Sequence, residues 1–301
     1  RSHAHADHAR AGHGAVLATR QTLDLMAIRY GEDFAASRQT AEGAMHIGDT
    51  TVSFHPAGHI LGSAQIAVTV GGTRVTVSGD YARVPNPSCA PWEPVPCDIF
   101  VTEATFGLPV FHHPDPAVEA RKLLASVASF LDRAHLVGAY ALGKAQRVIM
   151  LLRQAGWDAP IFIHGALQRL CDYHLEQGIA LGDLRPATTD QMRKADFAGQ
   201  IILAPPSAFE ATWAQRFPDP VIAFASGWMA VRARARQRGV ELPLVISDHV
   251  DWGDLTRTIT ELDPAETWVT HGREDAVIRW CDLQGRRAIP LHLAGYEDEA
   301  E

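Results

Sequence analysis

The chain has 301 residues, of which 47% are hydrophobic, and a formal net charge of −8. This length is enough for a core of native size and predicts two lobes, and the absence of an apolar run of about 18 residues excludes a membrane-spanning helix. The negative charge argues against binding nucleic acid through a globally basic surface, although metal ions in a site would still attract phosphate locally.

The chain opens with a cluster of metal-binding side chains in Ser2-His3-Ala4-His5-Ala6-Asp7-His8. In an extended segment, side chains two residues apart point the same way, so His3 and His5 can share one ion. Asp7 and His8 then face elsewhere and can serve a second ion, as in two-metal hydrolytic sites. Imidazole nitrogen and carboxylate oxygen suit zinc or manganese. A cloning tag would repeat histidine and would not place aspartate in this register, so we predict a metal site.

Residues 10–19 lead into a predicted helix over 22–29, and a predicted strand covers 50–54. The next candidate ligand, His59, follows this strand. Glycines on both sides of His59, in the segment 56–64, allow the backbone to turn tightly and to approach a metal pocket closely. A lone histidine is more often an ordinary core or surface residue. Because the chain already carries a metal motif that lacks a ligand, we expect His59 to supply it.

Two predicted strands, 64–70 and 73–78, form a hairpin, and Asp80 follows the second strand directly after a glycine. A carboxylate at a strand end is well placed to bridge two cations, whereas the alternative is a turn aspartate, which is a common role. The position of Asp80 after two histidine motifs favours the ligand. A short buried strand over 99–102 then leads to Glu103.

Residues 108–243 have a different pattern, in which helices and short strands alternate. The predicted helices cover 119–131, 142–153 and the stretch after 164 through 174, and the predicted strands cover 136–140, 160–164, 200–204 and 221–225. This alternation predicts a parallel sheet covered by helices, which is an α/β lobe in its own right. Lys144 at a helix start, and Ser226 and Gly227 at a strand-to-helix junction, could bind a phosphate. The arginine-rich run 232–238 could follow a phosphate backbone or form a solvated helix face.

The last part of the chain contains two strands that each end at a histidine. The strand over 244–246 ends at Ser247-Asp248-His249, and the strand over 267–269 ends at Thr270-His271-Gly272. Either histidine alone could be a capping or core residue. In a chain that already carries a metal motif, two strand-end histidines predict one active-site rim.

The H-x-H-x-D-H start and the G-H-x-L-G-S segment around His59 resemble signature motifs of the metallo-β-lactamase superfamily. The resemblance implies an α/β fold, the αββα sandwich, with metals at one end of two packed sheets. In that superfamily a hairpin and a strand precede the first motif, so we expect that an N-terminal segment is missing from this sequence.

Four further segments make the chain similar, over essentially its whole length, to the β-CASP nucleases of that superfamily; they are 102–107, 142–146, 247–249 and 270–272. The segments 138–146 and 224–229 resemble bacterial ligase-associated DNA exonucleases, which are also labelled mRNA 3′-end processing factor-like. The resemblance implies an inserted α/β β-CASP domain. We therefore expect a metallo-β-lactamase domain in two parts, 1–107 and 244–301, around a β-CASP cassette at 108–243.

The resemblance also implies roles for the candidate site residues. One metal would be held by His3, His5 and His59, the other by Asp7, His8 and His271, with Asp80 bridging both. We expect zinc, with manganese as the alternative, because two such cations make hydroxide available near neutral pH. His249 would be the general acid and Glu103 would orient it, so Asp7, Glu103 and His249 are the expected catalytic residues.

The function expected from this resemblance is a DNA exonuclease in DNA repair, acting near an ATP-dependent DNA ligase and a helicase. A β-CASP ribonuclease of the RNA 3′-end processing type is the alternative, because the RNA-directed group has histidine at the position of His271 where Artemis-type relatives have valine. A small-molecule metallohydrolase is a third interpretation, but it would not need the insertion or His249. The four cysteines form no C-x-x-C pair, so we expect a reducing cytoplasm.

Overall fold

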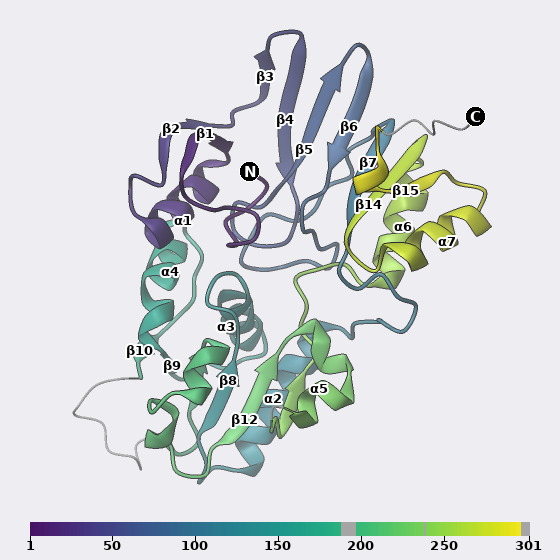
Figure 1. Cartoon of the computed structure of the whole chain (residues 1–301). Helices are drawn as coiled ribbons and strands as arrows, with labels where there is room; N and C mark the ends of the chain where they lie inside the picture. The colour runs from purple at the N-terminus through teal and green to yellow at the C-terminus, as the bar shows by residue number, and fades with distance from the viewer. Residues whose placement is uncertain (188–196, 238, 296–301) are drawn as a thin grey trace. The chain divides into compact units, whose positions relative to one another are not determined.

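The computed structural model describes residues 1–187, 197–237 and 239–295. The chain forms two compact units (Figure 1). The discontinuous unit comprises Arg1–His112 and His249–Glu301, and the inserted unit comprises His113–Asp248. These boundaries lie a few residues after the predicted ones at 107/108 and 243/244. No helix in the described part of the chain is long and apolar enough to cross a membrane.

A seven-stranded sheet forms the centre of the discontinuous unit, in the order β15-β14-β7-β6-β5-β4-β3. Strands β3 to β6 are antiparallel neighbours, and β6, β7, β14 and β15 pair in parallel. The strands are β3 (Ala44–Ile47), β4 (Thr50–Pro56), β5 (Ala64–Val70), β6 (Thr73–Val77), β7 (Ile99–Ala104), β14 (Glu266–Gly272) and β15 (Ala288–Pro290). The carboxyl ends of the parallel strands β6, β7 and β14 therefore lie side by side at the same end of this sheet, where Asp80, Glu103 and His271 are found.

The resemblance implied a second sheet in this unit, but its strands were not predicted from the local pattern. It pairs β1 (His13–Ala18) with β2 (Ala35–Thr40) in parallel, and α1 (Arg20–Tyr30) connects the two strands. The segment before α1 was expected only to lead into a helix. The helix begins where the Thr19 hydroxyl accepts a hydrogen bond from the amide of Thr22, and it ends at Gly31, which has a φ of 91°.

Two helices, α6 (Trp252–Leu262) and α7 (Glu274–Leu283), lie beside β14 and β15 (Figure 1). Their apolar side chains join those of the sheet in a core that includes Phe100, Ile259 and Val277. The Asp251 carboxylate caps α6 by accepting a hydrogen bond from the amide of Asp254. This cap, two residues after His249, fixes the start of α6 at Trp252.

The inserted unit contains a six-stranded sheet in which every pair is parallel, in the order β10-β9-β11-β8-β12-β13. The strands are β8 (His135–Gly138), β9 (Ile161–Ile163), β10 (Leu184–Pro186), β11 (Ile201–Ala204), β12 (Val221–Ala225) and β13 (Leu242–Leu244). Every residue of β9 and β11 is buried and apolar, which is typical of strands in a parallel sheet that is buried on both faces. The predicted α/β fold class, with an inserted α/β unit, is confirmed.

The helices of the inserted unit contribute, together with its strands, to the larger of its hydrophobic cores. They are α2 (Pro116–Ser129), α3 (Lys144–Gln154), α4 (Gly165–Glu176) and α5 (Arg232–Gln237). Four short 3₁₀ helices are complete in the described part of the chain: η2 (Pro206–Glu210), η3 (Ala214–Arg216), η4 (Gly227–Ala230) and η5 (Leu291–Leu293), of which the last lies in the discontinuous unit. Residues of α2, α3 and α4, such as Leu123, Leu152 and Leu167, pack on one another and on the sheet. The start of α3 lies one loop after β8, which places Lys144 near the carboxyl end of that strand.

Candidate metal centre

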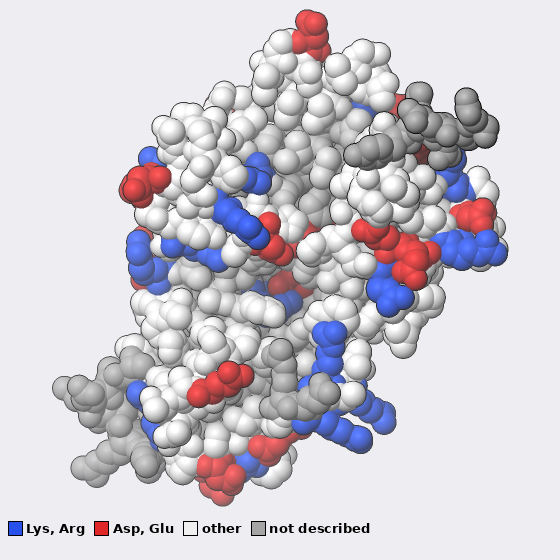
Figure 2. Space-filling model, viewed as in Figure 1, with Lys and Arg blue, Asp and Glu red and all other residues white. Residues whose placement is uncertain are grey.

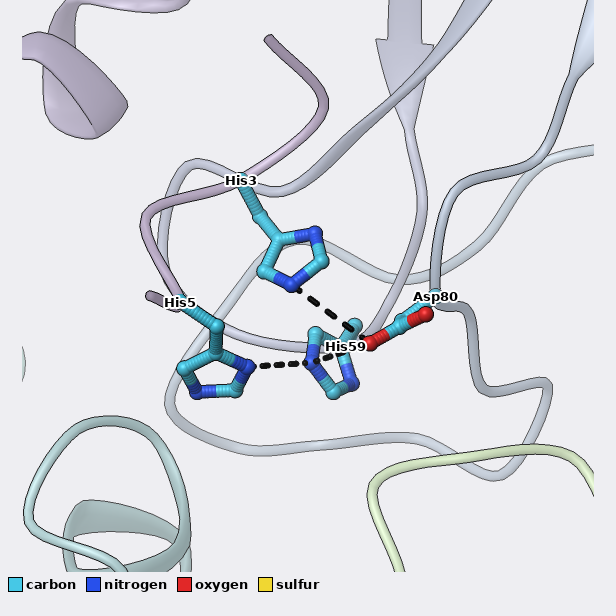
Figure 3. Close-up of side chains that lie close together, drawn as sticks. All are labelled: His3, His5, His59 and Asp80. Atoms are coloured by element: carbon cyan, nitrogen blue, oxygen red, sulfur yellow. Dashed lines mark hydrogen bonds and ion pairs between the residues drawn. The ribbon is translucent and has the colours of Figure 1, made fainter. Parts of the chain in front are cut away.

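Four side chains from three segments that lie far apart in the sequence meet in the discontinuous unit (Figure 3). They are His3, His5, His59 and Asp80, and their nitrogen and oxygen atoms all lie within 4.8 Å of one another. Nε2 of His3 is 3.5 Å and Nε2 of His59 is 3.7 Å from Oδ2 of Asp80. Nε2 of His59 is also 3.1 Å from Nδ1 of His5. The loop before β1, the loop after β4 and the end of β6 thus converge on one point.

A second group of possible ligands shares Asp80 with the first. His8, Asp80 and His271 lie within 4.8 Å of one another by their ligand atoms, and so do His3, Asp7 and His8. Nε2 of His8 is 3.4 Å from Oδ1 of Asp80, the oxygen opposite the one that faces His3. The two oxygens of Asp80 therefore face different histidines, which is the arrangement that a bridging carboxylate requires.

His271 reaches this group because β14 is irregular at its end. The register between β14 and β7 shifts between Thr270 and Gly272, and His271 has a φ of 56° in the left-handed region. Gly272 has a φ of 138°, and a Cβ at this position would lie 2.0 Å from the carbonyl oxygen of Ala104. The bulge turns His271 toward His8, whose ring centre lies 5.7 Å from its own.

Burial and like charges set the protonation of this centre. Burial, followed by the neighbouring histidines His59, His5 and His8, lowers the pKa of His3 well below its usual value, so His3 is neutral. Burial, followed by the charge of Glu103, raises the pKa of Asp80 to about 6. Nε2 of His3 and Oδ1 of Asp80 are buried and have no hydrogen-bond partner. Neutral imidazoles and orphaned buried acceptors are what a divalent cation would coordinate, so these residues fit such an ion.

A histidine–carboxylate pair lies next to these groups. Nδ1 of His249 is 2.8 Å from Oε2 of Glu103, and Glu103 is only 2% exposed. The amide of Tyr81 donates to Oε1 of Glu103 over 2.8 Å, and the hydroxyl of Thr105 donates to Oε2. Burial alone would raise the pKa of Glu103, but His249 and these donors lower it, so Glu103 is a carboxylate. Asp80, Glu103 and His249 also lie within 4.8 Å of one another by their ligand atoms.

Tyr81 and Thr105 were missed by sequence reasoning. Tyr81 directly follows Asp80 and Thr105 lies in the segment 102–107, but only the folded chain shows that they donate to Glu103.

A cavity of about 670 Å³ lies beside the second group of possible ligands. Its polar wall includes Asp7, His8, Asp80, Glu103 and His271. Its apolar wall is formed by the sheet residues Val52, Phe54, Ile66, Val77 and Val101. The centre is thus reachable from a cavity in the discontinuous unit.

The predicted phosphate-binding residues lie in the inserted unit. Lys144 is only 6% exposed, and its ammonium group binds the Asp248 carboxylate over 2.8 Å, which argues against the predicted contact with phosphate. The Ser226 hydroxyl accepts a hydrogen bond from the amide of Trp228, and Ser226 and Gly227 are both buried. Their phosphate contact stays a prediction.

The arginines of α5 form a basic surface on the inserted unit, where Figure 2 shows blue side chains gathered. Arg232, Arg234 and Arg236 are exposed. The guanidinium carbon of Arg234 lies 3.8 Å from the ring centre of Trp228. Arg238, at the end of the predicted run, lies outside the described residues. The exposure of the other three arginines fits both predicted interpretations, a phosphate-binding surface and a solvated helix face.

Comparison with known proteins gives partial relatives. No protein-family model matches the chain. A probable DNA ligase of Opitutus terrae is 27% identical over 90% of the chain and 26% of the ligase. An endoribonuclease ysh1 of Emericella nidulans is 29% identical over 43% of the chain and 14% of that protein. Cleavage and polyadenylation specificity factor subunit 3 of Dictyostelium discoideum is 31% identical over 42% of the chain and 17% of that protein. The chain thus spans about a quarter or less of the length of these relatives.

Among solved structures, a protein of unknown function from Enterococcus faecalis V583 matches with a TM-score of 0.60 and 12% sequence identity. The match covers 96% of this chain and 77% of the other. At this identity the match shows a shared fold and nothing about activity.

Proposed function

We propose, from the premise that this chain belongs to the β-CASP branch of the metallo-β-lactamase superfamily, that it is a metal-dependent nuclease that hydrolyses phosphodiester bonds of DNA. The premise rests on the order of the metal motifs and on the relatives among ligases and endoribonucleases. The observation that carries the proposal is the pair of His249 and Glu103 beside the metal groups. Such a pair adds acid catalysis to a hydrolytic metal site.

The first ion would be held by His3, His5 and His59, the second by Asp7, His8 and His271, with Asp80 shared. When bound, two divalent cations lower the pKa of water toward neutrality and offset negative charge on a phosphate. Zinc is the proposed metal because imidazole dominates the donor set, and manganese is the alternative.

The pair of His249 and Glu103 would manage the leaving group. The Glu103 carboxylate accepts the Nδ1 proton of His249 and thereby fixes the plane of the imidazole ring. The negative charge of Glu103 favours the imidazolium form of His249. The imidazolium can then donate its Nε2 proton to the departing oxygen as the bond to phosphorus breaks.

DNA is the proposed substrate because the relative that covers most of this chain is a probable DNA ligase, whereas the endoribonuclease match covers less than half of it. The same comparison supports an association with a ligase. Association with a helicase, exonuclease action in DNA repair and a cytoplasmic location stay predictions. RNA is the second candidate, favoured by the endoribonuclease relatives and by the histidine at position 271.

The test is the degradation of end-labelled single-stranded DNA and RNA of one sequence, with zinc or manganese. Asp80→Ala serves as the inactivated variant, and Asp49→Ala serves as the control because Asp49 is an exposed carboxylate at a turn between two strands. Release of mononucleotides from DNA alone, lost only in Asp80→Ala, supports the proposal. Preferred cutting of RNA would identify a ribonuclease. A metal-loaded protein that cuts neither would refute the nuclease and favour a small-molecule metallohydrolase.

A further inference from the structure

Three charged side chains form a buried cluster in the inserted unit. Nζ of Lys144 is 2.8 Å from Oδ2 of Asp248, and Nη1 of Arg147 is 3.0 Å from Oδ1 of the same carboxylate. Lys144 is 6%, Arg147 is 1% and Asp248 is 3% exposed. Burying charges is costly unless they are paired, so this cluster holds its three members in one geometry.

Each of the two cations also binds the main chain next to Asp248. Lys144 donates to the carbonyl oxygen of Ile246 over 3.0 Å, and Arg147 donates to the carbonyl oxygen of Ser247. Lys144 and Arg147 are three residues apart on α3 and therefore lie on the same face of that helix. Three consecutive residues, 246–248, are thus anchored to one rigid helix by their carbonyls and by one carboxylate.

The anchored segment ends one peptide bond before His249. The ring of His249 is held at Nδ1 by Glu103, and the amide of the next residue, Val250, donates to the carbonyl oxygen of Tyr81. An imidazole that must deliver a proton needs both its ring plane and its backbone fixed, since a misplacement of about 1 Å can lower a rate by roughly 100-fold. Glu103 holds the ring, and the contacts with Lys144 and Arg147 hold the backbone up to the residue before His249.

We propose that Lys144 and Arg147 are positioning residues for His249, acting through the anchored segment 246–248. This inference rests on the proposed function, in which His249 protonates the leaving oxygen. Neither cation has the exposure that direct binding of nucleic acid would require. Lys144 and Arg147 therefore affect the rate of hydrolysis through the proton donor, His249. We expect this effect on the rate to be largest for substrates whose leaving group needs a proton.

The experiment compares Arg147→Met with Arg153→Met. Arg153 is a matched control because it lies on the same helix and also donates to carbonyl oxygens, but those of Trp157, Ala159 and Leu181. Two substrates are used, a DNA oligonucleotide and a p-nitrophenyl ester of thymidine 5′-phosphate. Nitrophenolate is a stable anion and departs without being protonated, whereas the sugar oxygen of DNA needs a proton in order to depart.

In Arg147→Met we expect kcat for the oligonucleotide to fall roughly 10- to 100-fold with an unchanged KM. We expect little change for the nitrophenyl ester and little change of either rate in Arg153→Met. Arg147→Lys, which keeps the charge, should recover part of the rate, and it replaces Arg147→Met in the comparison if that variant does not fold. Amide hydrogen exchange of a peptide covering 246–250 should accelerate in the Arg147 variant alone.

Equal losses on both substrates, or the same losses in Arg153→Met, would show a merely structural role and overturn the inference. A raised KM would overturn it in favour of a phosphate contact. Wild-type protein that cuts neither substrate would instead refute the proposed function, and unchanged exchange over 246–250 in the Arg147 variant would refute the anchoring independently of activity.

Discussion

Replacing Glu103 by glutamine tests how the proton donor is held. Glu103 accepts hydrogen bonds from the amide of Tyr81, the hydroxyl of Thr105 and Nδ1 of His249. The oxygen of a glutamine amide would stay with Tyr81, because that main-chain donor cannot turn away. The amide nitrogen, which is a donor, would then face Nδ1 of His249. Nδ1 of His249 could then only accept a hydrogen bond, through its lone pair. The imidazolium form, in which Nδ1 carries a proton, would lose the carboxylate that accepts this proton.

The magnitude follows from the bond that is lost. A hydrogen bond to a charged group contributes about 1.5–3 kcal/mol, and each ~1.4 kcal/mol changes a rate tenfold. If this bond acts in the transition state, kcat for DNA should fall roughly 10- to 100-fold in Glu103→Gln. Thr105→Val removes one neutral donor to the same carboxylate and serves as the control, with a fall of less than about tenfold.

The assay is single-turnover cleavage of end-labelled single-stranded DNA by protein whose metal content has been measured. Metal content must be known because Glu103 lies within 4.8 Å of Asp80 and His249 by its ligand atoms. A wild-type rate in Glu103→Gln would refute the reasoning. Loss of metal together with activity would show that Glu103 is a ligand and not the partner of the acid.

Three further predictions follow from the same structure. Burial raises the pKa of Asp80 to about 6, so below that pH a binding cation must displace the proton of this carboxyl group. Calorimetry should therefore show that, below pH 6, the zinc affinity of the wild type falls about tenfold more per pH unit than that of Asp80→Asn. An equal pH dependence of zinc affinity in the two proteins would contradict this. Burial lowers the pKa of Lys144 to about 8, so the folded protein releases this proton before the unfolded chain does. The free energy of unfolding, measured in urea, should therefore rise between about pH 8 and 10 by up to ~1.4 kcal/mol per unit relative to Lys144→Met, and a constant difference would be inconsistent with the burial. The Cβ of Gly272→Ala would lie 2.0 Å from the carbonyl oxygen of Ala104, so this variant should lose about 3 kcal/mol or more of the free energy of unfolding in urea. In Gly285→Ala the Cβ meets open space, so the loss in the same measurement should be about 1 kcal/mol. Similar losses in the two variants would show that the close approach to Ala104 does not matter.

Much of the inserted unit could be predicted from local patterns. The predicted strands 160–164, 200–204 and 221–225 correspond to β9, β11 and β12, because strands buried on both faces are continuous apolar runs with few alternatives. Strands β1 and β2 were missed, because most residues of β2 are exposed and only Val16 and Ala18 of β1 are buried, so neither strand has a clear apolar pattern.

The sequence by itself determined which donors the centre could use. His3, His5, Asp7 and His8 are neighbours in one short segment, so their chemistry is legible without any fold. Their grouping with His59, Asp80 and His271 is different, because it depends on three strand ends meeting at one edge of a sheet.

Only the tertiary structure decided what Lys144 does. Its position at the start of α3 predicted a phosphate contact, yet the folded chain buries its ammonium group against Asp248. A helix start is a local feature that a sequence reveals. Packing decides whether Lys144 is buried and which charged group about a hundred residues away it meets. The physical reason is that a buried charge must pair with a counter-charge, and the fold determines which one lies within reach.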